Sequence, residues 1–394
     1  MTRSGAAVAI VALLLARPSV ATADVALDWN EVAITTLISQ PPPGVSPFAQ
    51  ARFMAIIQLA VFEAVNAITG DYDPYLGTVV APPGASADAA AATAAYKVLK
   101  NYFAGAANLD PAYQASLDAI PDGPAKEDGI TIGEAAALQM ITLRANDGSS
   151  PAEFYPPQPA APGVWQATPS CPAGGGTNFH WKKVTPFGIP SDPMDPEAWI
   201  EPFRPDPPPA LTSLHYARDY NEVKTVGSVN STPDQRPPDR ADVARFFQAS
   251  SPSFAFNLAA RQVSAAQGRS LSHNARALAL INMATNDALV ASFGAKYFYD
   301  FWRPETAIHA GDTDDNPRTD PENPWAPYIT TPCFPSYPSN HASGSSGAGE
   351  MLRRLYGADG HDITLENPAV PGVVLEYTAF RQITDDVDDA RVYG

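Results

Sequence analysis

The sequence contains few cysteines and few basic residues. Its two cysteines, Cys171 and Cys333, do not form a Cys-x-x-Cys pair, which argues against a cysteine-based zinc or redox site. The sequence leaves open whether they form a disulfide. Only 25 Lys and Arg stand against 42 Asp and Glu, a formal net charge of −17. DNA, RNA and anionic membranes repel a chain this acidic, so we expect no nucleic-acid partner.

Several common catalytic motifs and long hydrophobic runs are also missing. We find no HExxH, GxSxG, Walker A or CxxCH motif. No run reaches the roughly 18 apolar residues of a transmembrane helix, so we expect no membrane span. The short apolar run at 6–16 follows Arg3 and precedes Ala21-Thr22-Ala23, the pattern of a secretory signal. We therefore expect a signal peptide at 1–23 and a secreted or periplasmic protein.

Most of the remaining sequence has helical patterns. The predicted helices cover residues 52–68, 86–103, 130–144, 213–226, 240–249, 254–267, 272–299 and 342–356. Ser86 and Ser272 are the expected N-caps of two of them, and Gly357 is expected just after the last. No series of alternating strands and no internal repeat is present. The sequence therefore predicts an all-α protein.

A proline-rich segment divides the predicted helices into two halves. Residues 151–210 hold 16 of the 41 prolines, and proline interrupts helices because it lacks a backbone donor. We expect four parts: the signal peptide, an N-terminal helical half at 24–150, an irregular crossing segment at 151–210, and a C-terminal helical half at 211–394. The long apolar helices are compatible with a homo-oligomer, but no heptad pattern specifies one.

Two cations lie near the end of the predicted helix 272–299. Lys296 and Arg303 are seven residues apart, about two helical turns or ~10 Å, so they would share one helix face. Pro304 disfavours helical backbone at Arg303, which predicts that the helix ends there. The two side chains could then converge on one anion beyond the helix end. Two solvated charges on an aromatic-rich helix would have the same spacing.

A second element, Pro338-Ser339-Asn340-His341, precedes a helix rich in small residues. A helix N-terminus presents free N–H groups and the positive end of its dipole, which together favour an anion. Ser339 could donate its hydroxyl, and His341 could act as general acid or base. A capped helix with a surface histidine would have the same pattern. A third element at 389–394 includes Arg391 but carries no signal alone.

Together, these pieces resemble the active-site motifs of the vanadium-dependent haloperoxidases, type 2 phosphatidic-acid phosphatases and bacterial acid phosphatases. The first motif of that superfamily is Lys, six residues, Arg-Pro, as at 296–304. The second is Pro-Ser-x-His, usually with Gly at x, where this chain has Asn340. The third is Ser-Arg, five residues, His, and 390–394 is similar to its first half. The flanks at 51–54 and 301–304 resemble the bacterial haloperoxidase-like branch.

The resemblance implies the helical-bundle fold of these enzymes and a bound vanadate. The implied oxyanion ligands are Lys296, Arg303, Ser339, Asn340 through its backbone N–H, and Arg391. His341 would be the catalytic acid or base. Phe334 lies five positions before Ser339, where similar haloperoxidases line their halide pocket, although a residue of the core would be equally consistent.

The final histidine of the third motif, which ligates vanadium in the family, would lie three positions beyond Gly394. We therefore expect a sequence truncated before that residue, with no metal ligand inside the chain. The resemblance implies a peroxidase that uses hydrogen peroxide to oxidise halide, with a small organic substrate as acceptor. Two alternatives remain open. One is a secreted acid phosphatase that binds phosphate as a substrate group, and the other is a non-catalytic helical protein that binds an anion.

Overall fold

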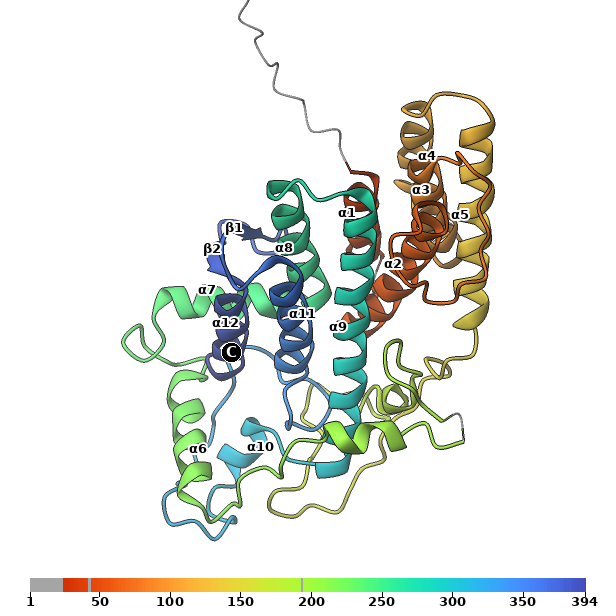
Figure 1. Ribbon diagram of the computed structural model, residues 1–394. Coiled ribbons are helices and arrows are strands. Elements are labelled where there is room, and N and C mark those ends of the chain that lie inside the picture. The colour runs from red at the N-terminus through yellow and green to blue at the C-terminus, as the bar shows by residue number, and fades with distance from the viewer. Residues whose placement is uncertain (1–23, 42–43, 193) are drawn as a thin grey trace, which may run out of the picture.

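The computed structural model describes residues 24–41, 44–192 and 194–394, and its regular secondary structure is almost entirely helical (Figure 1). This confirms the predicted all-α class. The expected signal peptide, residues 1–23, lies outside the described residues. The N-terminal half contains α1 (Val25–Ile38), α2 (Pro47–Thr69), α3 (Ala87–Tyr102), α4 (Leu109–Asp118) and α5 (Pro124–Leu143).

Helix α2 is the centre of this half. It packs against α3, α5 and α9 (Leu271–Tyr299), which explains why its sequence is apolar on all sides. Its length and hydropathy would also suit a membrane span, but 83% of its most apolar window is buried inside the protein. Helices α3 and α5 approach closely because Gly133 has no side chain. A Cβ there would lie 2.6 Å from the carbonyl oxygen of Ala90.

The proline-rich segment contains no α-helix among its described residues. It has only two short 3₁₀ turns, η1 (Phe179–Lys183) and η2 (Ala198–Phe203). Asp287 of α9 anchors it by accepting hydrogen bonds from the backbone N–H groups of Phe187 and Gly188, at 2.8 and 2.7 Å. The four-part domain division itself stays a prediction.

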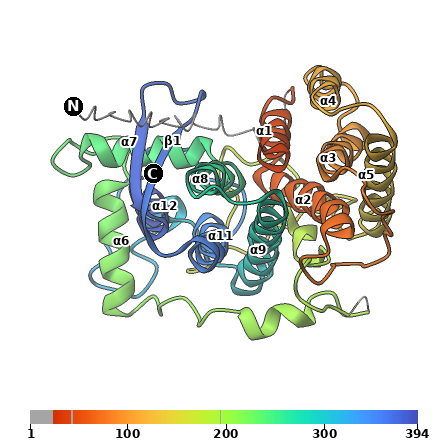
Figure 2. The same ribbon diagram turned by 45° about the horizontal axis from the view of Figure 1, so that its top comes forward.

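The C-terminal half forms a second bundle. Its elements are α6 (Leu214–Val226), α7 (Pro238–Ala249), α8 (Pro252–Ala266), α9, α10 (Pro304–His309), α11 (Asn340–Tyr356), β1 (Asp359–Glu366), β2 (Val374–Ala379) and α12 (Phe380–Val392). Helix α9 joins the two bundles because it packs on α2 and on α11, and it lies between them in Figure 2. Helix α12 packs against α11 and α7.

Two details correct the sequence predictions. Strands β1 and β2 form an antiparallel hairpin. It was not predicted because only Ile363 and Leu365 give β1 an alternating apolar pattern. The N-cap of α9 is Ser270, which accepts a hydrogen bond from the N–H of His273. Ser272, the predicted cap, is instead buried within the first turn.

Candidate active site

The two cations of the first motif do not share a helix face, contrary to the sequence prediction. Helix α9 ends at Tyr299 because Asp300 adopts a left-handed conformation, with φ 47°. Arg303 is the N-cap of α10, with φ −82° and ψ 153°, the extended conformation expected before Pro304. Lys296 is therefore in the last turn of α9, and Arg303 reaches the site from the following connection.

Both cations nevertheless bind one loop through three consecutive carbonyl groups. The Nζ of Lys296 donates to the carbonyl oxygens of Pro335 and Ser336, at 2.9 and 2.8 Å. The Nε of Arg303 donates to the carbonyl of Phe334 at 2.7 Å. The Phe334 ring lies 5.3 Å from Nζ of Lys296 and 4.8 Å from the guanidinium carbon of Arg303, within the range of cation–π attraction. The sequence prediction that these side chains converge is therefore consistent with the structure.

The second motif forms the N-terminus of α11, as predicted. Ser339 is the N-cap, and its Oγ accepts a hydrogen bond from the N–H of Ala342 at 3.2 Å. The hydroxyl of Ser343 donates to the carbonyl of Ser339 at 2.8 Å and braces the same turn. Asn340 and His341 thus occupy the first turn, where helix N–H groups are unsatisfied and the dipole is positive.

Arg391 reaches the same place from the last turn of α12. Its Nη1 lies 3.4 Å from Nδ1 of His341, while its Nε and Nη2 are buried without a partner among the described residues. The packing of α12 on α11 therefore brings the third motif against the second.

All the predicted oxyanion ligands line one cavity of about 300 Å³, which we call the basic cavity. It is lined by Lys296, Arg303, Ser339, Asn340, His341 and Arg391, with Phe334 beside them. The structure thus brings together every residue that the sequence singled out, while their individual roles stay predictions.

The sequence did not indicate several other residues of the basic cavity. Glu305 lines it and accepts a hydrogen bond from the hydroxyl of Thr331 at 2.5 Å. Its place two residues after Arg303 could have marked it as a candidate. Phe48 and Gln248 also line the cavity. They belong to helices far from the motifs in sequence, so no local pattern pointed to them.

Burial makes the positive charges of the basic cavity costly. Burial, reinforced by the charge of Arg303, lowers the pKa of Lys296 well below its usual range. Burial and the nearby charges of Arg391, Lys296 and Arg303 lower the pKa of His341 in the same way. Burial and Arg391 lower the pKa of Arg303 to about 9, and burial lowers that of Arg391 to about 10. An anion among these groups would oppose every one of these shifts.

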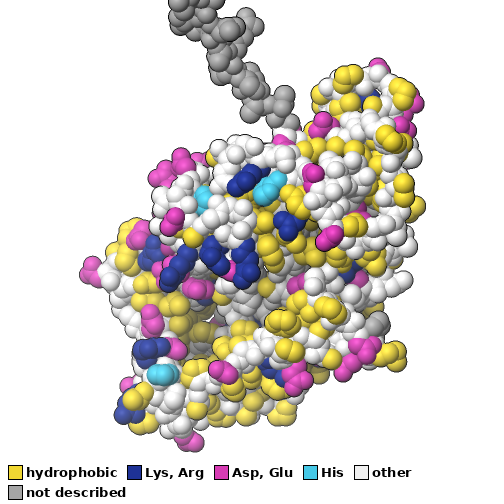
Figure 3. All heavy atoms as spheres, in the orientation of Figure 1, with side chains coloured by type: hydrophobic (Ala, Val, Ile, Leu, Met, Phe, Trp, Pro, Cys, Tyr) yellow, Lys and Arg dark blue, Asp and Glu magenta, His cyan; other side chains and the backbone are white. Residues whose placement is uncertain are grey.

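Although Glu305 lines the basic cavity, the cations of the cavity lack the ion pairs that other basic side chains form. On the face shown in Figure 3, basic side chains gather over α11 and α12. On these two helices, Arg353 and Arg354 pair with Glu350, and Arg381 pairs with Asp385. None of the ion pairs among the described residues includes a cation of the basic cavity.

The residues of the cavity therefore fit an oxyanion such as vanadate. The Nη2 of Arg303 and the Nε and Nη2 of Arg391 are buried donors without acceptors among the described residues. Guanidinium groups suit the planar, multiple hydrogen bonds that an oxyanion can accept. An oxyanion would satisfy these donors and neutralise the uncompensated charge together.

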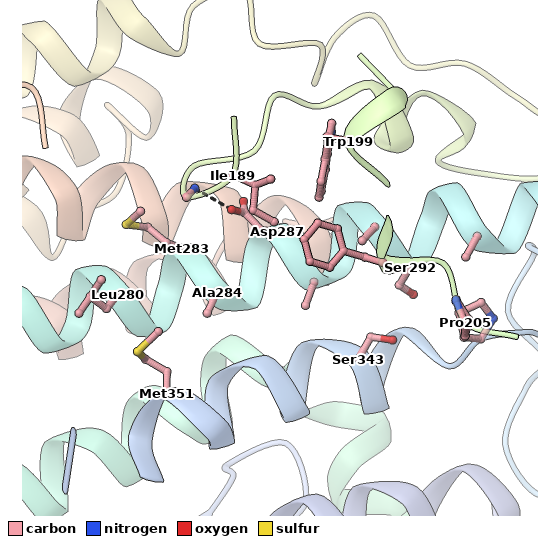
Figure 4. A pocket seen from close by; sticks show the side chains of 16 residues that line it. Ile189, Trp199, Pro205, Leu280, Met283, Ala284, Asp287, Ser292, Ser343 and Met351 are labelled. Carbon is pink, nitrogen blue, oxygen red and sulfur yellow. Dashed lines mark hydrogen bonds between the residues drawn. The ribbon is translucent and has the colours of Figure 1, made fainter. Parts of the chain in front are cut away.

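A separate apolar groove of about 630 Å³ runs along another face of α9 (Figure 4). Its lining includes Trp199, Met283 and Met351. Ser292 and Ser343 also line it, near the first turn of α11. The hydroxyl of Ser292 donates a hydrogen bond to the side-chain oxygen of Asn340, so one contact links this groove to the basic cavity.

Comparisons with known proteins agree with this geometry. Residues 276–394 match the family model of the VCPO second helical-bundle domain. Over 93 residues the chain is 34% identical to the vanadium chloroperoxidase of Curvularia inaequalis, a match that covers 21% of this chain and only 14% of that protein.

The fold is shared over most of the chain. A bacterial vanadium-dependent iodoperoxidase superposes with a TM-score of 0.73 at 22% identity, covering 94% of this chain and 89% of that one. The holo form of a bacterial vanadium-dependent chloroperoxidase gives 0.66 at 17% identity, covering 91% and 88%. The predicted resemblance is confirmed: residues 276–394 match the model of the second helical-bundle domain, and the chain has the vanadium haloperoxidase fold.

Proposed function

We propose that the protein is a vanadate-dependent haloperoxidase that uses hydrogen peroxide to oxidise halide. The oxidised halogen species then halogenates a small organic substrate. One observation carries the proposal. Lys296, Arg303, Arg391 and His341 line one cavity, Lys296 is fully buried there, and none of the four forms an ion pair among the described residues. A protein with a net charge of −17 that buries such a cluster has a site suited to a bound anion.

In this proposal Lys296, Arg303 and Arg391 bind the oxygens of vanadate, and Ser339 and the N–H of Asn340 donate further hydrogen bonds. Bound vanadate supplies the centre at which hydrogen peroxide becomes reactive toward halide. The three carbonyl groups of residues 334–336 orient Lys296 and Arg303. These contacts hold the two cationic side chains in place before the oxyanion binds. The side chains can then stabilise negative charge on the oxyanion without first changing their positions.

His341 is proposed to hold and move a proton. In the absence of an anion, burial and the surrounding charges keep its pKa low and its ring neutral. A bound oxyanion offsets those positive charges and raises the pKa of His341 toward its ordinary value. An imidazole that titrates near neutral pH is a suitable general acid or base.

Phe334 is proposed to contact the halide. Its ring is oriented by edge-to-face packing on Phe48 and Phe293, with centroids 6.0 and 5.5 Å away. Its face is near Lys296 and Arg303. The edge of an aromatic ring is electropositive, so this arrangement would tolerate a halide beside the basic cavity.

A phosphatase is the second candidate, because the unpartnered guanidinium donors would serve a tetrahedral phosphate equally well. The same residues would stabilise the transition state of phosphoryl transfer.

We also propose that the protein acts in an oxidising compartment outside the cytoplasm. In support, Cys171 and Cys333 form a disulfide with a Cα–Cα distance of 5.3 Å, and such bonds persist mainly in oxidising environments.

The test uses the purified protein. It is loaded with vanadate and assayed with hydrogen peroxide and bromide or iodide for halogenation of a phenolic dye, and separately for hydrolysis of a phosphate ester. We expect halogenation that disappears in His341→Ala and persists in His215→Ala, which removes an exposed histidine of α6. Hydrolysis without halogenation would favour the phosphatase. Oxyanion binding without either reaction would favour a non-catalytic anion-binding protein.

A further inference from the structure

The side chain of Asn340 is a buried polar group that the proposed mechanism does not use. The resemblance assigns only its backbone N–H to the oxyanion. Its side chain is also almost fully enclosed, with 5% of the residue exposed, and Asn340 lines the basic cavity next to Ser339 and His341. A carboxamide in such a place needs hydrogen-bond partners, because burying an unpaired polar group is unfavourable.

Only one end of this carboxamide has a partner. Its Oδ1 accepts a hydrogen bond from the hydroxyl of Ser292 on α9, and Ser292 is itself only 4% exposed. Its Nδ2 has no acceptor among the described residues. Because the carboxamide is planar with its oxygen and nitrogen on opposite sides, the bond to Ser292 turns Nδ2 away from that contact.

The carboxylate of Glu305, which also lines the cavity, accepts a hydrogen bond from Thr331 but none from Nδ2. The basic neighbours of Asn340 cannot supply the missing acceptor. Lys296, Arg303 and Arg391, which line the same cavity, carry side chains that only donate hydrogen bonds. Together with Nδ2, they form a set of donors around one space. A negatively charged group with several acceptor oxygens is the ligand that satisfies them all.

We propose that the Asn340 side chain is a further oxyanion ligand, which donates its Nδ2–H to a bound tetrahedral dianion such as phosphate or vanadate. Ser292 is then a positioning residue, because its hydroxyl holds the carboxamide with the donor turned to the ligand. The inference rests on the proposed function only in assuming that the basic cavity binds an oxyanion. It gives this chain a hydrogen bond that a glycine at position 340 could not make.

Calorimetric titration with inorganic phosphate tests the inference. Asn340→Ala removes the donor, and we expect its affinity to fall by about tenfold or more, as for one hydrogen bond to a charged group. Asn340→Asp keeps the shape but replaces the donor with a negative charge, so its affinity should fall further. Ser292→Ala should cause a smaller loss of several-fold, because the carboxamide is released but not removed.

Thr285→Val is the matched control. Thr285 is a buried residue of α9 whose hydroxyl donates to the carbonyl of Ile281 in its own helix, and it does not line the basic cavity. Its affinity for phosphate should stay within twofold of the unchanged protein. Thermal unfolding of each variant shows whether it is folded. If Asn340→Ala does not fold, the phosphate affinity of Asn340→Asp tests whether the side chain is a ligand.

The outcomes separate this inference from the proposed function. If Asn340→Ala and Asn340→Asp bind phosphate as tightly as the unchanged protein, the side chain is not a ligand, although the basic cavity still is an oxyanion site. If Ser292→Ala behaves like Thr285→Val, the positioning role of Ser292 is wrong. If the unchanged protein binds neither phosphate nor vanadate, both the inference and the proposed function are overturned.

Discussion

The Nη1 of Arg391 donates toward Nδ1 of His341 across 3.4 Å, which joins the last turn of α12 to the first turn of α11. A guanidinium group only donates hydrogen bonds, so Nδ1 accepts and the proton of the neutral ring is on Nε2. The same contact places a positive charge beside the imidazole. It therefore sets the tautomer of His341 and disfavours a second proton on it.

Anion binding should be coupled to proton uptake. The positive neighbours that lower the pKa of Lys296 and His341 are offset when an oxyanion binds, so both pKa values rise and protons are taken up. Sulfate is a suitable probe because its charge is constant across this range. The affinity of the protein for sulfate should fall as the pH rises through the pKa of Lys296. That pKa is below the usual range of lysine, so the fall should occur at lower pH than for an ordinary lysine. Calorimetry in buffers with different ionisation enthalpies measures the uptake.

Lys296→Arg is the control for this prediction. Arginine keeps its charge to higher pH than lysine, so the loss of sulfate affinity should move to higher pH in this variant. An affinity that does not change with pH in the unchanged protein, together with no proton uptake, would show that these groups are already charged in the empty cavity.

Removing one buried charge should stabilise the empty protein and weaken its anion binding. Arg391→Met replaces a cation without an acidic partner among the described residues by an apolar side chain of similar length. We expect the free energy of unfolding without anion to rise by about 1–2 kcal/mol, because uncompensated buried charge is unfavourable. Phosphate affinity should fall by tenfold or more. Urea unfolding with and without phosphate measures both effects, and a large loss of stability without phosphate would contradict this account.

The residues of the site were predictable because their patterns are local. A proline directly after Arg303 and a serine cap before α11 act within a few residues, so the sequence alone indicated a non-helical Arg303 and a helix N-terminus at Ser339. Phe48 could not be found in this way. It comes from the first turn of α2 and reaches the cavity only through the packing of α2 against α9.

Two errors in the fold have different physical causes. The predicted range 272–299 ends α9 at the right residue, but the expectation that Lys296 and Arg303 share a helix face was wrong because Asp300 adopts a positive φ without being glycine, and the aromatic pattern continues past it. Helix α12 was missed although its buried residues Phe380, Ile383, Val387 and Ala390 have helical spacing. Its many charged residues hid that apolar stripe. The first error needs tertiary contacts to resolve, whereas a stricter periodicity search would have corrected the second.

Breaking the Cys171–Cys333 disulfide should weaken anion binding. Cys333 immediately precedes the loop 334–336 that binds Lys296 and Arg303, and its carbonyl accepts hydrogen bonds from Thr177. The disulfide therefore tethers one side of this loop to the proline-rich segment. We expect Cys171→Ser with Cys333→Ser to lose about 2–5 kcal/mol of stability and several-fold in phosphate affinity. Phosphate titration at a temperature below the unfolding transition of the variant checks this. An unchanged phosphate affinity would show that the loop carbonyls keep Lys296 and Arg303 in place without the disulfide.

Asp147 should be essential for stability rather than for chemistry. Its carboxylate is buried and binds two buried arginines, Arg52 at 2.7 Å and Arg144 at 2.9 Å. Burial alone would raise the pKa of Asp147, and the arginines instead lower it. Its contribution to stability is therefore present above the ordinary pKa of aspartate and is lost as the pH falls through the lowered pKa of the folded state.

Asp147→Asn leaves both guanidinium groups buried without a counter-charge, so the free energy of unfolding should fall by about 3–5 kcal/mol. Arg144 also donates to the carbonyl of Thr185, so the loss should include the attachment of the proline-rich segment to α2. Asp122→Asn, which breaks an exposed ion pair with Lys126, should cost less than about 1 kcal/mol. Similar urea midpoints for the two variants would mean that backbone carbonyls alone hold Arg52 and Arg144, and that the carboxylate adds little to the contact between α2, the end of α5 and the proline-rich segment.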